Sequence, residues 1–584
     1  MITTCFLMRA GVMFRIRIWT FVAVFLVVLP VRAADRAILD YDQLFHPVVG
    51  LNGMVSSQEA VASAVGLDIL KKGGNAVDAA VAVGFALAVT LPKAGNLGGG
   101  GFMLVHLAEE GKTIAIDYRE QAPARAGRDM FLDPDGEVNQ RLTRFSHLSA
   151  GVPGTVAGLA HVLERHGTMP LDEVLAPAIE LAENGIVITH ALADSLGGRG
   201  KRLRANPASL EKFFKPGGEA YRPGDLFKQP DLAWTLRMIA RHGANAFYKG
   251  AVADKIVAEM KAHGGLVSLQ DLAAYKVVER EPVRGAYRGI DVISMPPPSS
   301  GGVHIIQMLN ILEGLPLRRT GHNSAQTLHY LAETMKLAYA DRGEYLGDPD
   351  FYDVPVQALT SRSYAERLRA GISADTARPS SDIKPGRLPP RESPDTTHFS
   401  VMDQAGNAVA NTYTLNFSYG SGITVAGAGF LLNNEMDDFS AKPGTPNAFG
   451  LIGGAANAIE PGKRPLSSMT PTMLFKDGKP FLVTGSPGGS TIITVVLQVL
   501  LNVVDHGMNI AAASSVPRIH HQWLPDQLFV EPGVSPDTVR LLQSRGHTVK
   551  FTRGLGSTES ITWVDGVFYG ASDPRRPGAA TYGF

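Results

Sequence analysis

Alternating apolar and polar side chains predict a β-hairpin in the second half of the chain. Residues 396–402 (TTHFSVM) and 408–415 (AVANTYTL) have the pattern of strands, and residues 403–407 (DQAGN) have the composition of a turn. Pairing outward from this turn places Thr396 opposite Thr414. Opposed residues share one face of a sheet, with Cβ atoms about 4.5–5.5 Å apart. We therefore expect two threonine hydroxyls to meet where the first strand begins, although a slip of one residue would separate them.

Helical patterns dominate the first half. Ser56 and Glu59 have the spacing of a capping box ahead of a helix. The alanine-rich run 76–91 predicts a second helix, because Asn75 can cap its start and Pro92 ends it. This run is shorter than the roughly 20 residues that a spanning helix needs, so we expect it to be buried in the protein rather than in a membrane.

The order of these patterns indicates an α/β protein. Residues 150–350 are mostly helical in pattern, whereas strands are concentrated after residue 396. Between them, residues 373–395 are rich in Pro, Ser, Asp and Arg, which predicts an exposed linker or processing segment. A chain of 584 residues is long enough for one very large domain or two interlocked halves.

The composition and net charge of the chain are those of an ordinary globular protein. Hydrophobic residues make up 45% of the chain and charged residues 19%, as expected of a globular protein. The 55 acidic and 55 basic residues balance. Nucleic-acid-binding proteins usually carry a basic excess, so we expect no nucleic-acid partner.

The first 33 residues have the pattern of an export signal. Three arginines between positions 9 and 17 precede an apolar stretch, 18–30, and Ala33 offers a cleavage position. A membrane anchor is the alternative, but the stretch is short for that role. We therefore expect a periplasmic or secreted protein. Cys5, the only cysteine, lies in this signal, so the mature chain would have neither a disulfide nor a catalytic thiol.

Several longer motifs resemble the γ-glutamyltranspeptidases. In chain order they are 95–103 (GNLGGGGFM), 117–122 (DYREQA), 395–400 (DTTHFS), Asn416, 433–440 (NNEMDDFS), 464–469 (RPLSSM) and 484–490 (TGSPGGS). They occur in the family's order and cover essentially the whole predicted mature chain, which makes the resemblance specific.

The resemblance implies an N-terminal nucleophile hydrolase with a four-layered αββα sandwich, made as an inactive precursor. The precursor would cut itself between Asp395 and Thr396, giving a large subunit (34–395) and a small subunit (396–584) that stay together as a heterodimer. The Thr396 hydroxyl would attack the γ-glutamyl amide, with its freed α-amine as the base. An α-amine has a reference pKa of about 7.7–8.0, which suits a base near neutral pH.

The resemblance also implies a cradle for the glutamyl group. It assigns the α-carboxylate to Arg119, Ser467 and Ser468, and the α-amino group to Asn416, Glu435 and Asp438. An arginine suits a carboxylate because its planar fork can bind both oxygens. Taken singly, these residues have ordinary interpretations: Arg119 could pair with Asp117 or Glu120 at the surface, and the two acidic residues could lie in a solvated turn.

Gly488 and Gly489 lie between an apolar strand, 481–484, and a probable helix from about Ser490. Backbone N–H groups at a helix start favour negative charge, and in the family these two glycines form the oxyanion hole. A plain tight turn is the alternative; a phosphate loop is disfavoured because no Gly-Lys-Ser/Thr follows. For the similar run 98–101 we expect close packing and no catalytic role.

A histidine pair and one aromatic residue are two further features of the sequence. His520 and His521 could suggest a metal, but adjacent side chains do not converge, so we predict no metal site and no cofactor. Phe449 lies in the segment that resembles the family's lid loop, where many bacterial relatives have a tyrosine. Phenylalanine keeps the ring and loses the hydroxyl, which changes how the lid can close.

The expected donors are glutathione and other γ-glutamyl compounds, with water, amino acids or peptides as acceptors. One alternative is a related acylase that removes glutaryl groups from cephalosporins. Glutaryl lacks the α-amino group, so the acceptors at Asn416, Glu435 and Asp438 would be left unpaired. Another is a secreted binding protein that keeps the fold and never cleaves itself.

Overall fold

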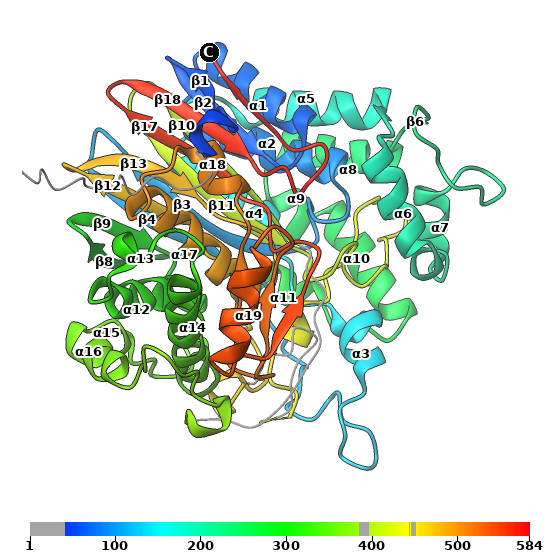
Figure 1. Cartoon of the computed structure of the whole chain (residues 1–584). Helices are drawn as coiled ribbons and strands as arrows, with labels where there is room; N and C mark the ends of the chain where they lie inside the picture. Colours follow the sequence, from blue (N-terminus) through cyan, green and yellow to red (C-terminus); the bar gives the residue numbers. More distant parts are fainter. Residues whose placement is uncertain (1–40, 385–395, 443, 445–450, 452) are drawn as a thin grey trace, which may run out of the picture. The chain divides into compact units, whose positions relative to one another are not determined.

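A computed structural model describes residues 41–384, 396–442, 444, 451 and 453–584 (Figure 1). The predicted signal with Cys5, the Asp395 side of the predicted cleavage bond and Phe449 lie outside the described residues. No helix among the described residues is both long and apolar enough to cross a bilayer.

Two seven-stranded antiparallel sheets form the centre of the fold. The first has the order β19 (Ala580–Gly583), β2 (Gly53–Ser57), β10 (Thr396–Asp403), β11 (Ala408–Thr414), β3 (Gly100–Leu107), β4 (Lys112–Tyr118) and β7 (Val278–Arg280). The second has the order β1 (Val48–Gly50), β18 (Val567–Ser572), β17 (Glu559–Val564), β13 (Lys479–Thr484), β12 (Thr472–Lys476), β9 (Ile290–Ser294) and β8 (Val283–Tyr287). Polar contacts join their facing sides: the Ser400 hydroxyl donates to the Glu559 carbonyl at 2.8 Å.

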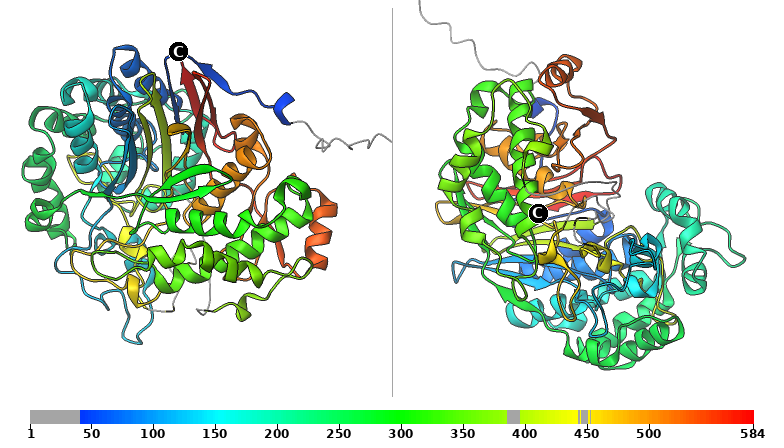
Figure 2. Two further views of the ribbon diagram at one scale, coloured as in Figure 1. Left: turned by 90° about the vertical axis from the view of Figure 1, so that its left-hand side faces the viewer. Right: turned by 90° about the horizontal axis from the view of Figure 1, so that it is seen from below.

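Helices cover the outer face of each sheet (Figure 2). The first sheet packs against α1 (Ala60–Lys71), α2 (Ala76–Thr90) and α4 (Thr155–His166); α5 (Leu171–Asn184) packs against α2, and α8 (Pro230–His242) packs against α5. The second packs against α12 (Gly301–Glu313) and α17 (Thr491–Val504), and α14 (Ala325–Tyr345) packs against α12. The four-layered αββα sandwich is therefore confirmed.

The remaining α-helices lie around this sandwich. They are α3 (Gln140–Phe145), α6 (His190–Leu203), α7 (Pro207–Phe213), α9 (Asn245–Tyr248), α10 (Ala251–Ala262), α11 (Leu269–Ala274), α13 (Leu317–Thr320), α15 (Val356–Leu359), α16 (Arg362–Ala370), α18 (Ile510–Ser515) and α19 (Pro536–Ser544). Two small sheets complete the fold: β5 (Ile186–Val187) with β6 (Leu226–Phe227), and β14 (Ile519–His520), β15 (Leu528–Val530) and β16 (Val549–Phe551).

The predicted hairpin register is confirmed. β10 and β11 pair with Thr396 opposite Thr414. Phe399 and Val401 pack into the apolar core that the first sheet shares with α2. Met402 packs on the opposite face, in the core that includes the second sheet and its helices. Because side chains alternate along a strand, Thr396 lies on the same face as Met402 and points toward the second sheet.

The hairpin turn is tied to the start of α2. The Asp403 carboxylate accepts hydrogen bonds from the backbone N–H of Asn407 (3.0 Å) and from the Asn407 amide (2.8 Å), which closes the turn. It also accepts from the backbone N–H of Ala76 at 2.9 Å. An acidic group is favourable at a helix N-terminus, where backbone donors lack partners. One side chain thus fixes both the turn and its position against α2.

Local predictions had mixed outcomes. Asn75 caps α2 in a capping box with Asp78, as the predicted start of that helix requires. The capping box at Ser56 is wrong: Ser56 lies in β2, and its hydroxyl bonds Thr581 of the neighbouring strand β19 (2.8 Å) and Glu559 of the second sheet (3.2 Å). Glu59 itself caps α1, accepting from the Ala62 N–H at 3.0 Å. Burial between two sheets outweighs the short-range capping preference of this serine.

The glycine run 98–101 is tightly packed, whereas the described part of the polar segment 373–395 is mostly at the surface. Close packing at 98–101 is confirmed, since a Cβ on Gly99 would lie 1.9 Å from the Thr414 carbonyl oxygen. Of the polar segment 373–395, the described part, 373–384, is mostly exposed. Ser380 is an exception: it is buried, because Asp526 accepts from its N–H (2.9 Å) and the Trp523 indole donates to its carbonyl (3.0 Å).

We predict that Asp403→Ala lowers the free energy of unfolding by about 2–3 kcal/mol, because it leaves buried donors at the turn and at α2 unpaired. Gln404→Ala is the matched control, since Gln404 is an exposed residue of the same turn. Denaturant-induced unfolding of both variants measures the difference; equal midpoints would show that the turn is held by other contacts.

Candidate active site

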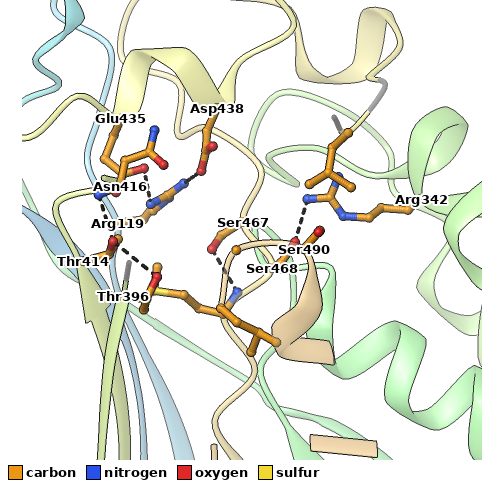
Figure 3. Close-up of a pocket in the computed structure, with 14 residues that line it drawn as sticks. Arg119, Arg342, Thr396, Thr414, Asn416, Glu435, Asp438, Ser467, Ser468 and Ser490 are labelled. Atoms are coloured by element: carbon orange, nitrogen blue, oxygen red, sulfur yellow. Dashed lines mark hydrogen bonds and ion pairs between the residues drawn. The ribbon is translucent and has the colours of Figure 1, made fainter. Parts of the chain in front are cut away.

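A small pocket opens where β10, β11 and the start of α17 meet (Figure 3). Nine residues of the predicted site line it: Arg119, Thr396, Thr414, Asn416, Glu435, Asp438, Ser467, Ser468 and Gly489. Five further residues line it that the sequence did not indicate: Arg342, Leu451, Met469, Ser490 and Ile492. Residues from widely separated parts of the chain therefore converge on one point.

Thr396 lies at the start of β10, on one wall of this pocket. Its Oγ1 is 3.5 Å from the Thr414 Oγ1, and both side chains are nearly buried. The Thr414 hydroxyl accepts from the backbone N–H of Asn416 at 2.8 Å. Asn416 has φ = +74°, a conformation that asparagine tolerates better than most residues. The bend after β11 thus brings Asn416 back beside the two threonines.

Arg119 lies among carboxylates within the pocket wall. Its guanidinium is 2.8 Å from Glu435 and 2.5 Å from Asp438, and 3.3 Å from its neighbour Glu120. Burial alone would lower the pKa of Arg119, but these three carboxylates outweigh it and raise that pKa. Asp117 pairs elsewhere, with Arg464 at 2.9 Å. The surface ion pair considered for Arg119 is therefore wrong, since the side chain is fully buried.

The carboxyl groups around Arg119 have little access to solvent. Glu435 and Asp438 lie on a 3-10 helix (Glu435–Asp438), where Glu435 is fully buried, so a solvated turn is excluded for it. Burial raises the pKa of Glu435 well above its ordinary value and also raises that of Asp438, although Arg119 opposes both shifts. Burial likewise raises the pKa of Glu120 to about 7. Arg119 therefore contacts three carboxyl groups whose neutral forms are favoured by burial.

Ser467 and Ser468 form the opposite wall. The Ser467 hydroxyl accepts from the backbone N–H of Met469 at 3.1 Å. The Ser468 hydroxyl accepts from Arg342 at 3.1 Å (Figure 3). Arg342 also donates to the Ser300 hydroxyl at 2.9 Å. These bonds fix both serine side chains at the rim of the pocket.

Arg342 is a second buried cation that the sequence did not indicate. Burial lowers its pKa to about 10, and the nearby Arg119 contributes in the same direction. It belongs to α14, which buries Met335, Tyr339 and Arg342 at helical spacing. Because α14 buries every residue from Leu331 to Arg342, including Glu333, Lys336 and Asp341, no periodic pattern distinguishes Arg342 in the sequence.

Gly488 and Gly489 lie between β13 and α17, as predicted. Their φ values are +141° and +54°, and a Cβ on Gly488 would lie 2.4 Å from the Thr491 hydroxyl. Glycine is therefore required at Gly488 by both conformation and space. Gly489 lines the pocket, whereas Gly488 is adjacent to it along the chain.

His520 and His521 have separate partners. His520 bonds the Thr494 hydroxyl at 2.8 Å, and His521 lies 3.2 Å from Asp526. Burial lowers the pKa of both rings. Each histidine is thus accounted for as a buried hydrogen-bonding residue.

The pocket combines a hydroxyl at a strand start, buried cations, buried carboxylates and a glycine turn at a helix N-terminus. Cations and hydroxyls suit a carboxylate, and carboxylates with an amide oxygen suit an ammonium group. The arrangement therefore fits a small zwitterion, held with one of its ends near the Thr396 hydroxyl.

Comparisons with known proteins agree with this geometry. The sequence model of the family described as Gamma-glutamyltranspeptidase matches residues 62–583. The glutathione hydrolase proenzyme of Escherichia coli (strain K12) is 55% identical over 544 residues, which cover 93% of this chain and 94% of that protein.

Solved structures give the same result. A cephalosporin acylase from Bacillus halodurans superposes with a TM-score of 0.81 at 30% identity, covering 92% of this chain and 97% of the acylase. A chain of the Helicobacter pylori gamma-glutamyltranspeptidase has a TM-score of 0.55 at 49% identity, covering 56% of this chain and 93% of its own length. This protein therefore belongs to the gamma-glutamyltranspeptidase family.

Proposed function

We propose that this protein is a γ-glutamyltransferase and glutathione hydrolase that activates itself by cleavage between Asp395 and Thr396. The observation that carries this proposal is the position of Thr396: it begins β10, faces Thr414, and lines a pocket that also holds Arg119, Glu435 and Asp438. Family membership and the relatives named as glutathione hydrolase proenzymes support the same activity.

Cleavage would convert an ordinary threonine into a nucleophile with its own base. The freed α-amine of Thr396 takes the proton from its hydroxyl as the oxygen attacks the γ-carbonyl carbon of the donor. The carbon–nitrogen bond then breaks, the proton passes to the leaving amine, and a γ-glutamyl ester remains on Thr396. Water or an amino acid attacks this ester and regenerates the hydroxyl. The N–H groups at Gly488 and Gly489 would stabilise the oxyanion of each tetrahedral intermediate.

Substrate recognition would use charges that already face one another in the pocket. Arg119, Ser467 and Ser468 would hold the α-carboxylate of the donor. Asn416, Glu435 and Asp438 would hold its α-ammonium group. An ammonium placed at Glu435 and Asp438 would pair with carboxylates, and a carboxylate placed at Arg119 would pair with a guanidinium.

The proposed function also implies how the two fragments assemble and where the enzyme is located. Residues 34–395 would form the large subunit and residues 396–584 the small subunit, joined as a heterodimer. Both parts contribute strands to both sheets, which supports their staying together after cleavage. Export to the periplasm or the medium, proposed from residues 1–33, would place the enzyme where extracellular glutathione is the donor.

We expect Thr396→Ala to remain a single inactive chain on a denaturing gel, whereas the wild type gives two fragments, the second beginning with Thr396. Thr397→Val is the matched control. Thr397 points to the opposite face of β10, and its hydroxyl has no hydrogen-bond partner among the described residues. Edman sequencing identifies the N-termini of both variants, and the turnover of γ-glutamyl-p-nitroanilide measures their activity. Cleavage and activity in Thr396→Ala would disprove the mechanism.

A glutaryl acylase is the second candidate, because the cephalosporin acylase fold is so similar. Glu435→Gln separates the two. If Glu435 binds the α-ammonium, the variant should lose about 10- to 100-fold in kcat/KM for γ-glutamyl-p-nitroanilide, since a hydrogen bond between charged groups is lost. Glutaryl-p-nitroanilide should be little affected. Glu460→Gln, at an exposed glutamate, is the control. A wild type that prefers the glutaryl donor would support the acylase instead.

The raised pKa values of Glu435 and Asp438 predict a pH dependence of binding. A carboxyl with a raised pKa takes up its proton at higher pH, and the protonated form cannot pair with an ammonium group. The KM for a γ-glutamyl donor should therefore rise as pH falls, beginning above the ordinary carboxyl range of about 4. The KM for a glutaryl donor should not follow this profile; parallel profiles for the two donors would contradict the assignment.

A further inference from the structure

A basic cleft of about 860 Å³ lies beside the pocket, between α3, α6 and the segment that follows Asn416. Its basic lining residues are Arg141, Arg144, His147, Arg199, Lys201 and Arg202. Of the described residues that line it, none is acidic. In a chain with no net charge, such a one-sided surface indicates a preference for anions.

Helix ends explain only part of this charge. Arg144 and the pair Lys201 and Arg202 lie in the last turns of α3 and α6, where cations complement the helix dipole. That dipole amounts to about half a negative charge at the C-terminal end of each helix. Arg144 is further matched by Asp437, at 3.3 Å. The exposed side chains of Arg141, Arg199 and Lys201 still leave a positive excess in the cleft.

The cleft also has an aromatic part. The rings of Phe145 and Phe417 are 6.0 Å apart, and the Arg202 guanidinium lies 5.0 Å from the Phe145 ring centre. Phe145 is 42% exposed, so apolar surface is open to a ligand. Cations around exposed aromatic surface suit a short peptide with carboxylates better than they suit an inorganic anion.

Consecutive residues of the chain line the cleft and the pocket. Phe417 lines the cleft and directly follows Asn416, which lines the pocket. Phe417 also packs against Leu451, another pocket residue. On the other side, Asp437 holds Arg144 of the cleft and precedes Asp438 of the pocket. A peptide extends by about 3.3–3.6 Å per residue, so a few residues beyond the scissile amide can reach from the pocket to the cleft.

We propose that the basic cleft binds carboxylates on the leaving-group side of the donor, so that anionic γ-glutamyl peptides are preferred over neutral γ-glutamyl amides. This inference rests on the proposed function. The pocket recognises the glutamyl group itself, and the cleft adds recognition of the peptide that departs. The same cleft receives an anionic peptide as acceptor in the second half of the reaction, because acceptor and leaving group occupy equivalent places.

The test compares two donors with the same glutamyl group in Arg199→Ala/Lys201→Ala. One donor is γ-glutamyl-p-nitroanilide, whose leaving group is neutral; the other is γ-glutamyl-glutamyl-glutamate, whose leaving group has three carboxylates. Exposed ion pairs are individually weak, so we expect about a three- to tenfold loss of kcat/KM for the acidic donor, mainly through KM. The anilide should change less than about twofold. The loss should shrink in about 0.5 M NaCl because salt screens exposed charges.

Lys476→Ala/Lys479→Ala is the matched control, since it removes the same charge from exposed positions at the β12–β13 turn. It should leave the ratio of the two donors unchanged. A second cleft variant, Arg141→Ala on α3, should reproduce the loss in smaller degree. Equal losses for both donors, or an unchanged donor ratio in both cleft variants, would overturn the inference. Failure of the proposed function is distinct: in that case the wild type would not turn over the anilide either.

Discussion

The site depends on the register between β10 and β11. This register places Thr396 opposite Thr414 and turns both side chains toward the second sheet. A shift of one residue would turn Thr396 toward α2 and bring Thr397 to the pocket instead. The apolar residues of β10 oppose such a shift, because Phe399 and Val401 would leave the core that they share with α2. The Asp403 contacts at the turn oppose it from the other end.

The second constraint is electrostatic. Arg119 is fully buried beside three carboxylates, and burying such a cluster is costly unless each charge is matched. Burial raises the pKa of Glu435, Asp438 and Glu120, and Arg119 opposes each of these shifts. The fold therefore holds carboxyl groups and a guanidinium in fixed contact at the pocket wall.

The sequence predicts those parts of the structure that depend on residues close together along the chain. The hairpin, the capped helix α2 and the turn at Gly488 each depend on patterns a few residues long. The αββα layers and the glutamyl residues came from the resemblance to a family, because no local pattern specifies which segments meet. Arg342 was missed for the same reason: it lines the pocket beside Ser468, which is more than a hundred residues away in the sequence. Ser56 was misassigned because its burial depends on Thr581, near the other end of the chain.

The pairing of β10 also explains how a new chain end could be used for chemistry. β11 pairs with Thr396 through Met402, whereas β2 pairs with β10 only from Phe399 onward. In the described sheet, Thr396, Thr397 and His398 therefore have a strand partner on one side alone. A cut before Thr396 would leave the strand held by β11 along its whole length and by β2 beyond its third residue. The new amine would then emerge at a side of the strand that no ladder occupies, next to its own hydroxyl and to the pocket. A base formed by cleavage needs this combination of a fixed strand and an unoccupied edge.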